Sequence, residues 1–215
     1  MPRKKDPVGP IIDATMQLAA LGGWRNVTLY DIAQETGMEV AEVVDAVGSR
    51  NGIIRRIAAR ADTAMLSAID ADWPDEAIRD RLFTMLIARF DHLKPYREGL
   101  RAVLASLPGD PIGAFALMAG PGQRTMRLAL EGAGVSNGGM TGALRMKALG
   151  IAYARTFRTF LNDDSPDLSK TMAALDKALS GLDRLAGRFR RGRSAFSDNT
   201  VKGKNTEAKA EPNPA

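Results

Sequence analysis

The sequence predicts an all-α protein, with a small N-terminal domain of three short helices followed by a larger helical region. Apolar residues recur at spacings of three and four along most of the 215 residues, which is the period of a helix with one buried face. Alternating runs of β-branched residues, the pattern of a half-buried strand, are absent. Glycines at positions 22, 23 and 37 separate the first helical segments, so these segments are short.

The short N-terminal helices have recognisable ends. The first is predicted over about residues 11–21 and stops at the glycine pair that follows it. The second begins after Thr28, whose hydroxyl can accept a hydrogen bond from a free amide, and Asp31 stands three residues later, as in a capping box. That helix ends before Gly37, and a third helix is predicted over about residues 40–47.

The larger region begins with a connecting helix, predicted over about residues 51–70. The sequence "DWPD" then interrupts the chain, because a proline disfavours the helical conformation in the residue before it. Two further helices are predicted, one over about residues 75–93 and one that follows Pro95 and runs to Leu107. The sequence "PGDP" at 108–111 is predicted to be a turn.

The last third of the chain contains one interruption and a final helix pair. Residues 112–132 have a helical pattern, but the Gly-Pro-Gly at 120–122 should break or kink the helix, because proline lacks an amide donor. The sequence "EGAGVSNGGMTG" is predicted to be a flexible loop before a helix over about residues 143–161. In "DDSPD", Ser165 is expected to cap the last helix and Pro166 to occupy its first position.

The composition argues against most enzymatic and metal-binding functions. The chain has no Cys and a single His, His92, which excludes thiolate sites and His-pair metal motifs and leaves little room for a His-centred triad. We expect His92 at a helix end, and we predict no enzyme activity, catalytic residue, metal or cofactor. No run of about eighteen apolar residues and no secretory signal is evident, so the cytoplasm is the expected compartment.

The positive charge is concentrated at the two ends of the chain. The formal net charge is +5; residues 1–10 contribute +2 and residues 188–215 contribute +4, which leaves −1 for the residues between them. Such basic ends can bind phosphates or a membrane surface, or they can be solvated tails. The predicted divisions are a basic arm at 1–10, the three-helix domain at 11–50, a larger helical domain at 51–190 and a disordered basic tail at 191–215.

Three stretches of the first 60 residues, "IIDATMQLAALGGW", "VTLYDIAQETGM" and "GSRNGII", occur in an order and spacing that resemble the helix-turn-helix domain of the TetR family of bacterial repressors. The resemblance implies a TetR-like fold, with a C-terminal domain that binds an effector and forms a homodimer. It also implies a transcriptional regulator whose third helix enters the major groove of double-stranded operator DNA. The residues expected at the DNA are Arg3, Lys4, Lys5, Arg25, Thr28, Tyr30, Glu39, Val40, Glu42 and Arg50.

The third helix departs from this family in its charge. It carries Glu39, Glu42 and Asp45 and no Lys or Arg, and residues 11–60 together hold five Arg against six acidic residues. Phosphate contacts supply much of the affinity for DNA, so carboxylates beside the DNA backbone weaken binding. One Glu can read the amino group of a cytosine, but three carboxylates on one short helix are harder to place. Whether this helix reads DNA therefore stays open.

A second resemblance fits the acidic third helix. The Gly23-Trp24 pair, the paired final helices and "DDSPDLSKTMAALDKAL" are similar to the ubiquinone-biosynthesis accessory family, which shares the TetR fold. This resemblance implies an isoprenoid-lipid ligand and membrane association in place of DNA binding. Residues 179–193 combine a leucine stripe with several Arg, a pattern that can lie on an anionic bilayer, although such a stripe can equally be core or dimer seam.

The TetR resemblance also implies an effector pocket and a dimer seam in the C-terminal domain. Met and aromatic side chains adapt to irregular apolar ligands, so the candidates for the pocket of an apolar effector are Met85, Phe90, Phe115, Met118, Met126, Met146, Tyr153 and Phe157. The same residue types at helical spacing can also be ordinary core. The dimer seam is expected along the near-heptad positions Leu168, Met172, Leu175, Leu179 and Leu182.

Overall fold

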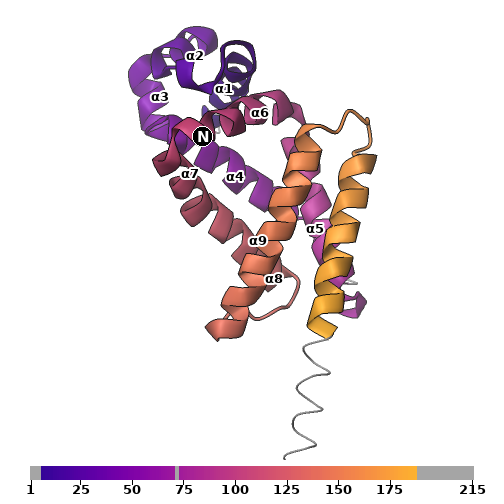
Figure 1. Ribbon diagram of the computed structural model, residues 1–215. Coiled ribbons are helices and arrows are strands. Elements are labelled where there is room, and N and C mark those ends of the chain that lie inside the picture. The colour runs from indigo at the N-terminus through magenta and orange to yellow at the C-terminus, as the bar shows by residue number, and fades with distance from the viewer. Residues whose placement is uncertain (1–5, 71–72, 188–215) are drawn as a thin grey trace, which may run out of the picture.

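The computed structural model describes residues 6–70 and 73–187 of the chain. These residues form helices and contain no strand, so the predicted all-α fold is confirmed. The short N-terminal helices lie at one end, and α4 leads from them into the longer helices of the C-terminal domain (Figure 1). The predictions for Arg3, Lys4, Lys5, the tail at 191–215 and the membrane segment beyond residue 187 lie outside the described residues.

The N-terminal domain is built from α1 (Val8–Gly22), the short turn η1 (Trp24–Asn26), α2 (Leu29–Thr36) and α3 (Val40–Val47). The predicted capping box of α2 is present: the Asp31 amide donates to the Thr28 hydroxyl at 3.1 Å, and the Thr28 amide donates to the Asp31 carboxylate at 3.0 Å. Gly37 ends α2 with a φ of 66°, a left-handed conformation that favours glycine. The sequence therefore defines the turn between α2 and α3 locally.

The joint between α3 and α4 (Arg50–Leu66) is unusually tight. Ser49 caps α4, because its hydroxyl accepts a hydrogen bond from the Gly52 amide at 3.1 Å. A Cβ atom added to Gly52 would lie 1.8 Å from the carbonyl oxygen of Val47, so only glycine fits at this position. The connecting helix ends at Leu66, earlier than the predicted residue 70.

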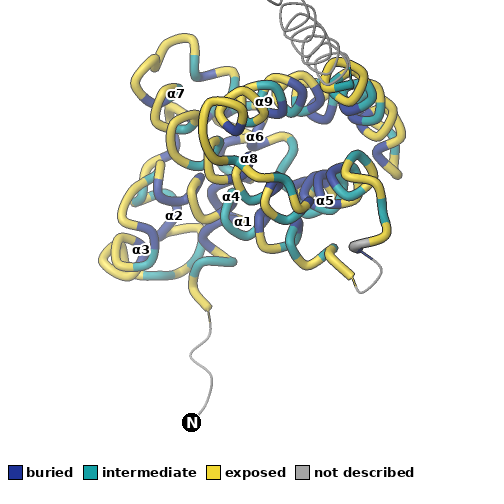
Figure 2. The backbone as a smooth tube through the Cα atoms, turned by 90° about the horizontal axis from the view of Figure 1, so that it is seen from below, coloured by how far each residue is buried: buried dark blue, intermediate teal, exposed yellow. Residues whose placement is uncertain are grey.

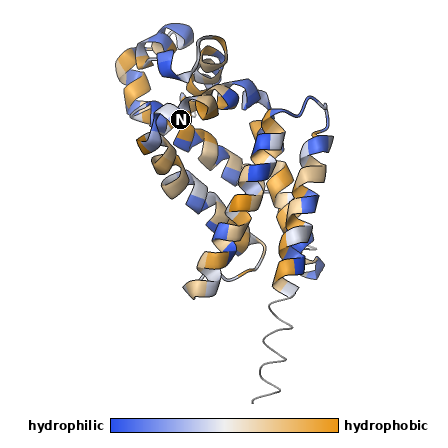
Figure 3. Ribbon diagram, in the orientation of Figure 1, coloured by the Kyte–Doolittle hydropathy of each residue, from blue (hydrophilic) through white to orange (hydrophobic). Residues whose placement is uncertain are grey.

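The C-terminal domain comprises α5 (Ile78–Leu93), α6 (Arg97–Ser106), α7 (Pro111–Leu117), α8 (Gln123–Gly132) and α9 (Gly139–Leu161), with short turns η2 (Trp73–Asp75), η3 (Lys94–Tyr96), η4 (Leu107–Gly109) and η5 (Met118–Gly122). Residues 169–187 form a further helix, the C-terminal helix, which runs back beside α9 (Figure 1). Hydrophobic residues recur along both (Figure 3). Among the described residues, no helix is long and apolar enough to cross a membrane.

The predicted interruption at Gly-Pro-Gly takes the form of a π-helical turn, η5, so the helical path continues from α7 into α8 instead of breaking. Proline has no amide to donate, and a wider turn accommodates the missing bond. The Pro121 carbonyl accepts a hydrogen bond from the Thr125 hydroxyl at 3.0 Å. This turn therefore brings Thr125 into the polar interior described below.

The predicted start of the last helix is wrong. Helical geometry begins at residue 169, and Pro166 lies in a turn before it. The physical reason is Leu168, which has a φ of 58° and a fully buried side chain, because a left-handed residue cannot continue a right-handed helix. Ser165 still contributes, since its hydroxyl accepts a hydrogen bond from the Ser169 amide at 2.9 Å.

Asp163 is the residue that anchors the start of the C-terminal helix. Its buried carboxylate accepts hydrogen bonds from the Thr171 amide at 2.7 Å and from the Thr171 hydroxyl at 2.6 Å, and the Ser165 amide donates to it at 3.0 Å. Burial by itself raises the pKa of Asp163, but the hydrogen bonds from Ser165 and Thr171 outweigh burial and lower the pKa to about 2.

The hydrophobic core does not stop at the boundary between the two domains. One cluster of buried side chains joins Ile11 of α1 to Leu100 of α6 and Phe160 of α9. The backbones of the two domains approach closely at Gly99 of α6, where an added Cβ atom would lie 2.6 Å from the carbonyl oxygen of Met16 in α1. The backbones of α1 and α6 are therefore in direct contact, and a side chain at position 99 would separate them.

Substitution of Asp163 should produce a defined change in acid stability. Because its pKa is about 2 in the folded protein and 3.8 ordinarily, the carboxylate stabilises the fold above about pH 4, and this contribution disappears as the pH falls toward 2. We expect Asp163→Asn to remove that pH dependence and to lower the free energy of unfolding at pH 7 by ~1–3 kcal/mol. Urea unfolding followed by circular dichroism measures both, with the exposed Asp164→Asn as control; equal pH profiles for the two variants would contradict the assignment.

A methyl group at Gly99 should destabilise the protein, although alanine is the better helix former. The new Cβ atom would meet the backbone of Met16, which cannot yield without moving α1 from α6. We expect a loss of ~1–3 kcal/mol in thermal or urea unfolding. The matched control is Gly181→Ala in the C-terminal helix, where nothing lies within 4 Å and alanine should stabilise the fold by up to ~1 kcal/mol. Stabilisation by both substitutions would refute the close contact.

Candidate functional site

The outward face of α3 is the candidate DNA-reading surface. Val43 and Val47 turn inward and are buried. On the opposite side, Val40 and Val44 are 38% and 40% exposed, and Asp45 is exposed as well. Because neither α2 nor α3 contains a Lys or Arg, the surface that this end of the molecule offers to a partner is apolar and acidic. Exposed residues predominate along α3 (Figure 2).

Two of the three carboxylates have a role within α3 itself. Glu39 is the N-cap residue, and its backbone amide donates to the Glu42 carboxylate at 3.2 Å. Both groups therefore lie at the first turn of the helix, where the helix dipole favours negative charge. Asp45 lies at the other end of the helix, where the same dipole does not favour it. Helix capping thus explains why Glu39 and Glu42 occur at the start of α3, without any contact to a DNA base.

Arg50 holds the N-terminal domain together instead of projecting its charge freely into solvent. Its Nη1 atom donates to the carbonyl oxygens of Trp24, Arg25 and Val27 at 3.1, 3.1 and 2.9 Å. The guanidinium also lies 5.5 Å from the centre of the Trp24 ring, within cation–π distance. The residue predicted to clamp a phosphate therefore closes the segment between α1 and α2, which positions the start of α2.

Arg25, another predicted DNA contact, reaches toward the C-terminal domain. Its Nη2 atom donates to the carbonyl oxygen of Ser106 at the end of α6, at 3.1 Å. The guanidinium packs so closely on η4 that a Cβ atom added to Gly109 would lie 1.6 Å from it. Arg25 thus links the helix-turn-helix domain to α6 through a hydrogen bond. Sequence reasoning could not place it there, because its partner is 81 residues away.

The remaining predicted DNA contacts differ in their availability. Tyr30, in the first turn of α2, is 61% exposed. The Thr28 hydroxyl is engaged in the capping box, where it also donates to Asp31 at 2.7 Å. Of the cations of α4, Arg56 donates to the Ala46 carbonyl at 3.2 Å and Arg60 pairs with Asp6, whereas Arg55 is exposed. Tyr30 is therefore the predicted contact that stands most clearly on the surface.

The predicted pocket residues fall into three groups. Met85, Phe90 and Met126 are buried; Met146, Tyr153 and Phe157 are partly buried; Phe115 and Met118 are 73% and 63% exposed. Three of the four aromatic members, Phe90, Tyr153 and Phe157, cluster with Phe160, and the ring centres of Phe90 and Tyr153 are 5.2 Å apart. The structure therefore brings Phe90, Tyr153 and Phe157 together, but it leaves Phe115 and Met118 on the surface of α7 and η5.

The sequence reasoning missed a buried polar cluster beside this stack. Arg89 and Asp62 form an ion pair with Nε and Oδ1 3.1 Å apart, and both side chains are almost completely buried. Arg89 also donates to the hydroxyl of Tyr153, and the Thr125 hydroxyl donates to Asp62 Oδ1 at 2.8 Å. Burial raises the pKa of Tyr153, so its hydroxyl stays protonated. One signal was available: Arg89 falls on the apolar stripe of α5, between Leu86 and Leu93.

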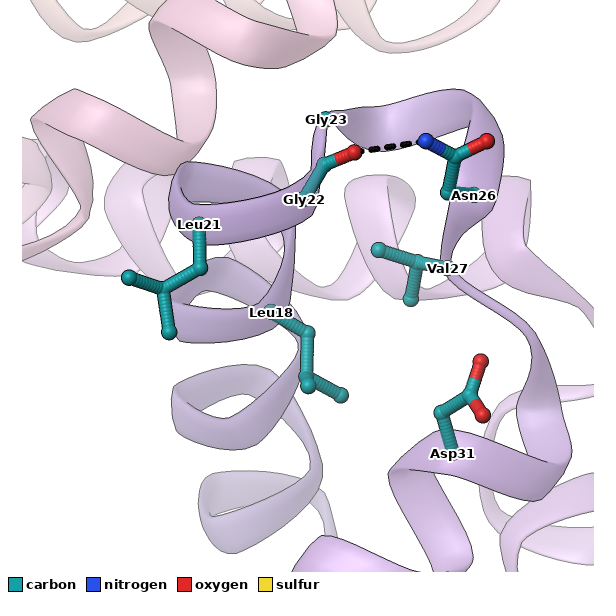
Figure 4. Close-up of a pocket in the computed structure, with 7 residues that line it drawn as sticks. All are labelled: Leu18, Leu21, Gly22, Gly23, Asn26, Val27 and Asp31. Carbon is teal, nitrogen blue, oxygen red and sulfur yellow. Dashed lines mark hydrogen bonds between the residues drawn. The ribbon is translucent and has the colours of Figure 1, made fainter.

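A separate hollow of about 280 Å³ lies in the N-terminal domain, between the end of α1 and the start of α2 (Figure 4). It is lined by Leu18, Leu21, Gly22, Gly23, Asn26, Val27 and Asp31. Asn26 closes one side by donating to the Gly22 carbonyl at 2.7 Å. None of the predicted pocket residues lines it, and its second polar side chain, Asp31, is already hydrogen-bonded in the cap of α2. We assign no ligand to it.

The residues predicted for the dimer seam divide between the interior and the surface. Leu168, Leu175 and Leu179 are buried within the chain itself, Leu182 is partly buried, and Met172 is 37% exposed. These three leucines pack against residues of their own chain, so their side chains are not available to a second chain. Exposed apolar side chains on the adjoining helices are Met140, Leu144 and Ile151 of α9 and Leu185 of the C-terminal helix. A second chain could contact those side chains directly.

The predicted position of His92 at a helix end is confirmed. His92 lies in the last turn of α5. Burial lowers its pKa, and the neighbouring Arg60 and Arg89 lower it further, so it is neutral near pH 7. Within residues 6–70 and 73–187, no group of three or more His, Cys, Asp or Glu side chains could hold a metal ion.

Comparison with known proteins gives one consistent result. No protein-family model matches the sequence, and no curated protein matches it. The structure is similar to that of a TetR transcriptional regulator from Nitrosomonas europaea, with a TM-score of 0.65 and 25% identity over 80% of this chain and 95% of that one. A TetR-family regulator from Mesorhizobium loti shares the fold with a TM-score of 0.54 and 12% identity, over 83% of this chain and 96% of that one. A TetR-family regulator from a Rhodococcus species shares it with a TM-score of 0.54 and 14% identity, over 80% of this chain and 98% of that one.

These neighbours include a transcriptional regulator that is 25% identical to this chain, which agrees with the prediction that the chain is not an enzyme. They also agree with the arrangement described above, in which a tight helix-turn-helix domain rests on a larger helical domain. The chain therefore has a TetR-like fold.

Proposed function

We propose that this protein is a DNA-binding transcriptional regulator controlled by a small-molecule effector with an apolar body. The observation that carries the proposal is the similarity to a TetR regulator over 80% of the chain, together with an intact turn between α2 and α3. The α3 face with Val40 and Val44 can make apolar contacts with thymine methyl groups. Phosphate contacts must come from elsewhere, and the candidates are the basic arm at residues 3–5, Tyr30 and Arg55.

Effector binding in the C-terminal domain would reach α3 through the contacts between the domains. Arg25 ties the segment before α2 to the end of α6, and Gly99 keeps α6 against α1. A displacement of α6 would therefore move the start of α2 and, through it, α3. This route supports regulation by an effector, because the two domains share one core and cannot shift independently.

The charge of α3 favours one alternative function. A helix whose outward face is apolar and acidic has weak electrostatic attraction for DNA, which is what a member of this fold that binds an isoprenoid lipid instead of DNA would require. In that case the apolar interior around Phe90 and Phe157 would hold the lipid, and residues 179–193 would supply the contact with the membrane. The two functions differ in what the purified protein binds.

DNA binding through α3 should respond to a charge on its outward face. We expect the protein to form a specific complex with the DNA upstream of its own gene, and we expect Val44→Glu to weaken that complex by at least about tenfold, because the new carboxylate faces the phosphates. Fluorescence anisotropy over a salt series measures the affinity. Ile112→Glu on α7, where the side chain is 82% exposed, is the control that adds the same charge away from α3.

The same measurement separates the two functions. Equal affinity of the two variants, or no specific complex at any salt concentration, would contradict DNA reading by α3. If isoprenoid lipid is then extracted from the purified protein and the protein binds anionic vesicles, the lipid-binding alternative takes its place. A shallow dependence of affinity on salt is expected even for a specific complex, because α2 and α3 themselves contain no Lys or Arg.

We also propose a homodimer through α9 and the C-terminal helix. Ile151 is 56% exposed on α9, and a glutamate there would place a charge in the seam without disturbing the core. We expect Ile151→Glu to be monomeric in light scattering at concentrations at which the wild type is dimeric. Leu21→Glu, at an 81% exposed site in the N-terminal domain, should remain dimeric. A dimeric Ile151→Glu variant would exclude α9 from the interface.

A further inference from the structure

The buried polar cluster lies where four helices of the C-terminal domain meet. Asp62 belongs to α4, Arg89 to α5, Thr125 to α8 and Tyr153 to α9. Asp62, Arg89 and Thr125 are at most 5% exposed. Burying a charged pair costs free energy that its attraction and hydrogen bonds must offset, and this requires each buried oxygen and nitrogen to find a partner.

Asp62 does not meet that requirement. Its Oδ1 atom accepts hydrogen bonds from Arg89 Nε at 3.1 Å and from the Thr125 hydroxyl at 2.8 Å. Its Oδ2 atom is equally inaccessible to solvent but accepts no hydrogen bond from any described residue. The Arg124 guanidinium forms a looser ion pair with this oxygen, because its Nε atom lies 3.7 Å from Oδ2, beyond hydrogen-bonding distance. One strong acceptor therefore points at a position that no donor fills.

The donors of the cluster are directed at acceptors other than Oδ2, because Arg89 Nη1 donates to the Tyr153 hydroxyl and Arg89 Nη2 to the Thr125 hydroxyl at 3.4 Å. The Thr125 hydroxyl lies 2.8 Å from Asp62 Oδ1 and 3.0 Å from the Pro121 carbonyl, so one proton is shared between two acceptors. The Pro121 carbonyl belongs to the π-helical turn η5, and such turns often occur at functional sites. An occupant that brings hydrogen-bond donors would satisfy Oδ2, whereas an anion would add a further acceptor and a repulsive charge.

The side chain that covers Oδ2 can move aside. Arg124 is 63% exposed, and its guanidinium makes no hydrogen bond with Asp62 at the observed distance. Displacing it into solvent therefore costs little, and a second cation can take its place beside the carboxylate. Apolar side chains border the cluster, because Met65 shares the inward face of α4 with Asp62 and Met126 adjoins Thr125 in the core. The position suits a cationic group on an apolar body.

We propose that Asp62 binds the protonated amine of a small apolar effector, which replaces the Arg124 guanidinium beside Oδ2. The inference deepens the proposed regulatory function, since it names the chemical class of the effector. It assigns binding of the amine to Asp62, orientation of Asp62 to Arg89 and Thr125, and control of access to Arg124. The pocket expected from the sequence was apolar, so a charged group in the ligand was not among the predictions.

The test compares three probes of similar size on the full-length protein without DNA: benzylamine, benzyl alcohol and benzoate. They differ in charge at the group that would meet Asp62. We expect benzylamine to raise the melting temperature and to bind at least about tenfold more tightly than the other two in calorimetry. Similar binding of all three probes, stronger binding of benzoate, or no binding of benzylamine would overturn the proposal.

Two variants locate the binding site. Asp62→Asn should reduce benzylamine affinity by about tenfold or more, because it removes the negative charge. Because that variant can also destabilise the core, Arg124→Ala provides an independent test. It removes the competing cation and should tighten benzylamine binding several-fold. Arg127→Ala, at an exposed position on the same helix, is the control and should have no effect. Unchanged or weaker binding in Arg124→Ala would refute the site.

A final experiment distinguishes failure of the effector-site proposal from failure of the proposed regulatory function. The same probes are added to the complex with upstream DNA, and release of the DNA by benzylamine, absent in Asp62→Asn, would support both proposals. If benzylamine binds as expected but no specific DNA complex forms, the amine site stands and the regulatory function fails. If DNA binds specifically and benzylamine does not bind, the regulatory function stands and the amine site fails.

Discussion

The contact between α1 and α6 is the constraint on which the rest of the structure depends. At Gly99 the two helix backbones approach so closely that no side chain fits between them, and the core around Ile11 continues through this contact into the C-terminal domain. Arg25 reinforces it from the exposed side through the Ser106 carbonyl. Because packed interfaces switch between discrete arrangements instead of deforming smoothly, a shift of α6 must be transmitted to the helix-turn-helix domain as a unit.

Several charged residues of the N-terminal domain make hydrogen bonds that stabilise the domain itself. Glu42 caps α3, Asp31 caps α2, and Arg50 gathers three carbonyl groups between α1 and α2. Short helices have little intrinsic stability, because most of their backbone groups lie in unpaired end turns. Carboxylates at their starts and an Arg at the intervening loop compensate for that deficit. The acidic character of α3 therefore follows in part from how the two eight-residue helices α2 and α3 are stabilised.

The C-terminal domain combines two kinds of interior. The stack around Phe90 and Phe160 is apolar and closely packed, while the adjoining Asp62–Arg89 pair is ionic and retains an unsatisfied oxygen. A purely structural ion pair would be expected to satisfy both carboxylate oxygens, since a buried acceptor without a donor costs ~1–3 kcal/mol or more. The π-helical turn at Pro121 lies beside this position and distinguishes it from the regular helical packing elsewhere.

The sequence by itself determined the features that depend on neighbouring residues: the helical class, the Thr28 cap, the left-handed Gly37 and the bounds of α2 and α3. Each of these rests on interactions within four residues, which a linear pattern records. Only the tertiary structure decided where Arg25, Arg50 and Asp163 direct their polar groups and which leucines of the C-terminal helix are buried. The Asp62–Arg89 pair joins residues 27 positions apart on different helices, so helix packing alone brings the two charges together and leaves one oxygen without a donor.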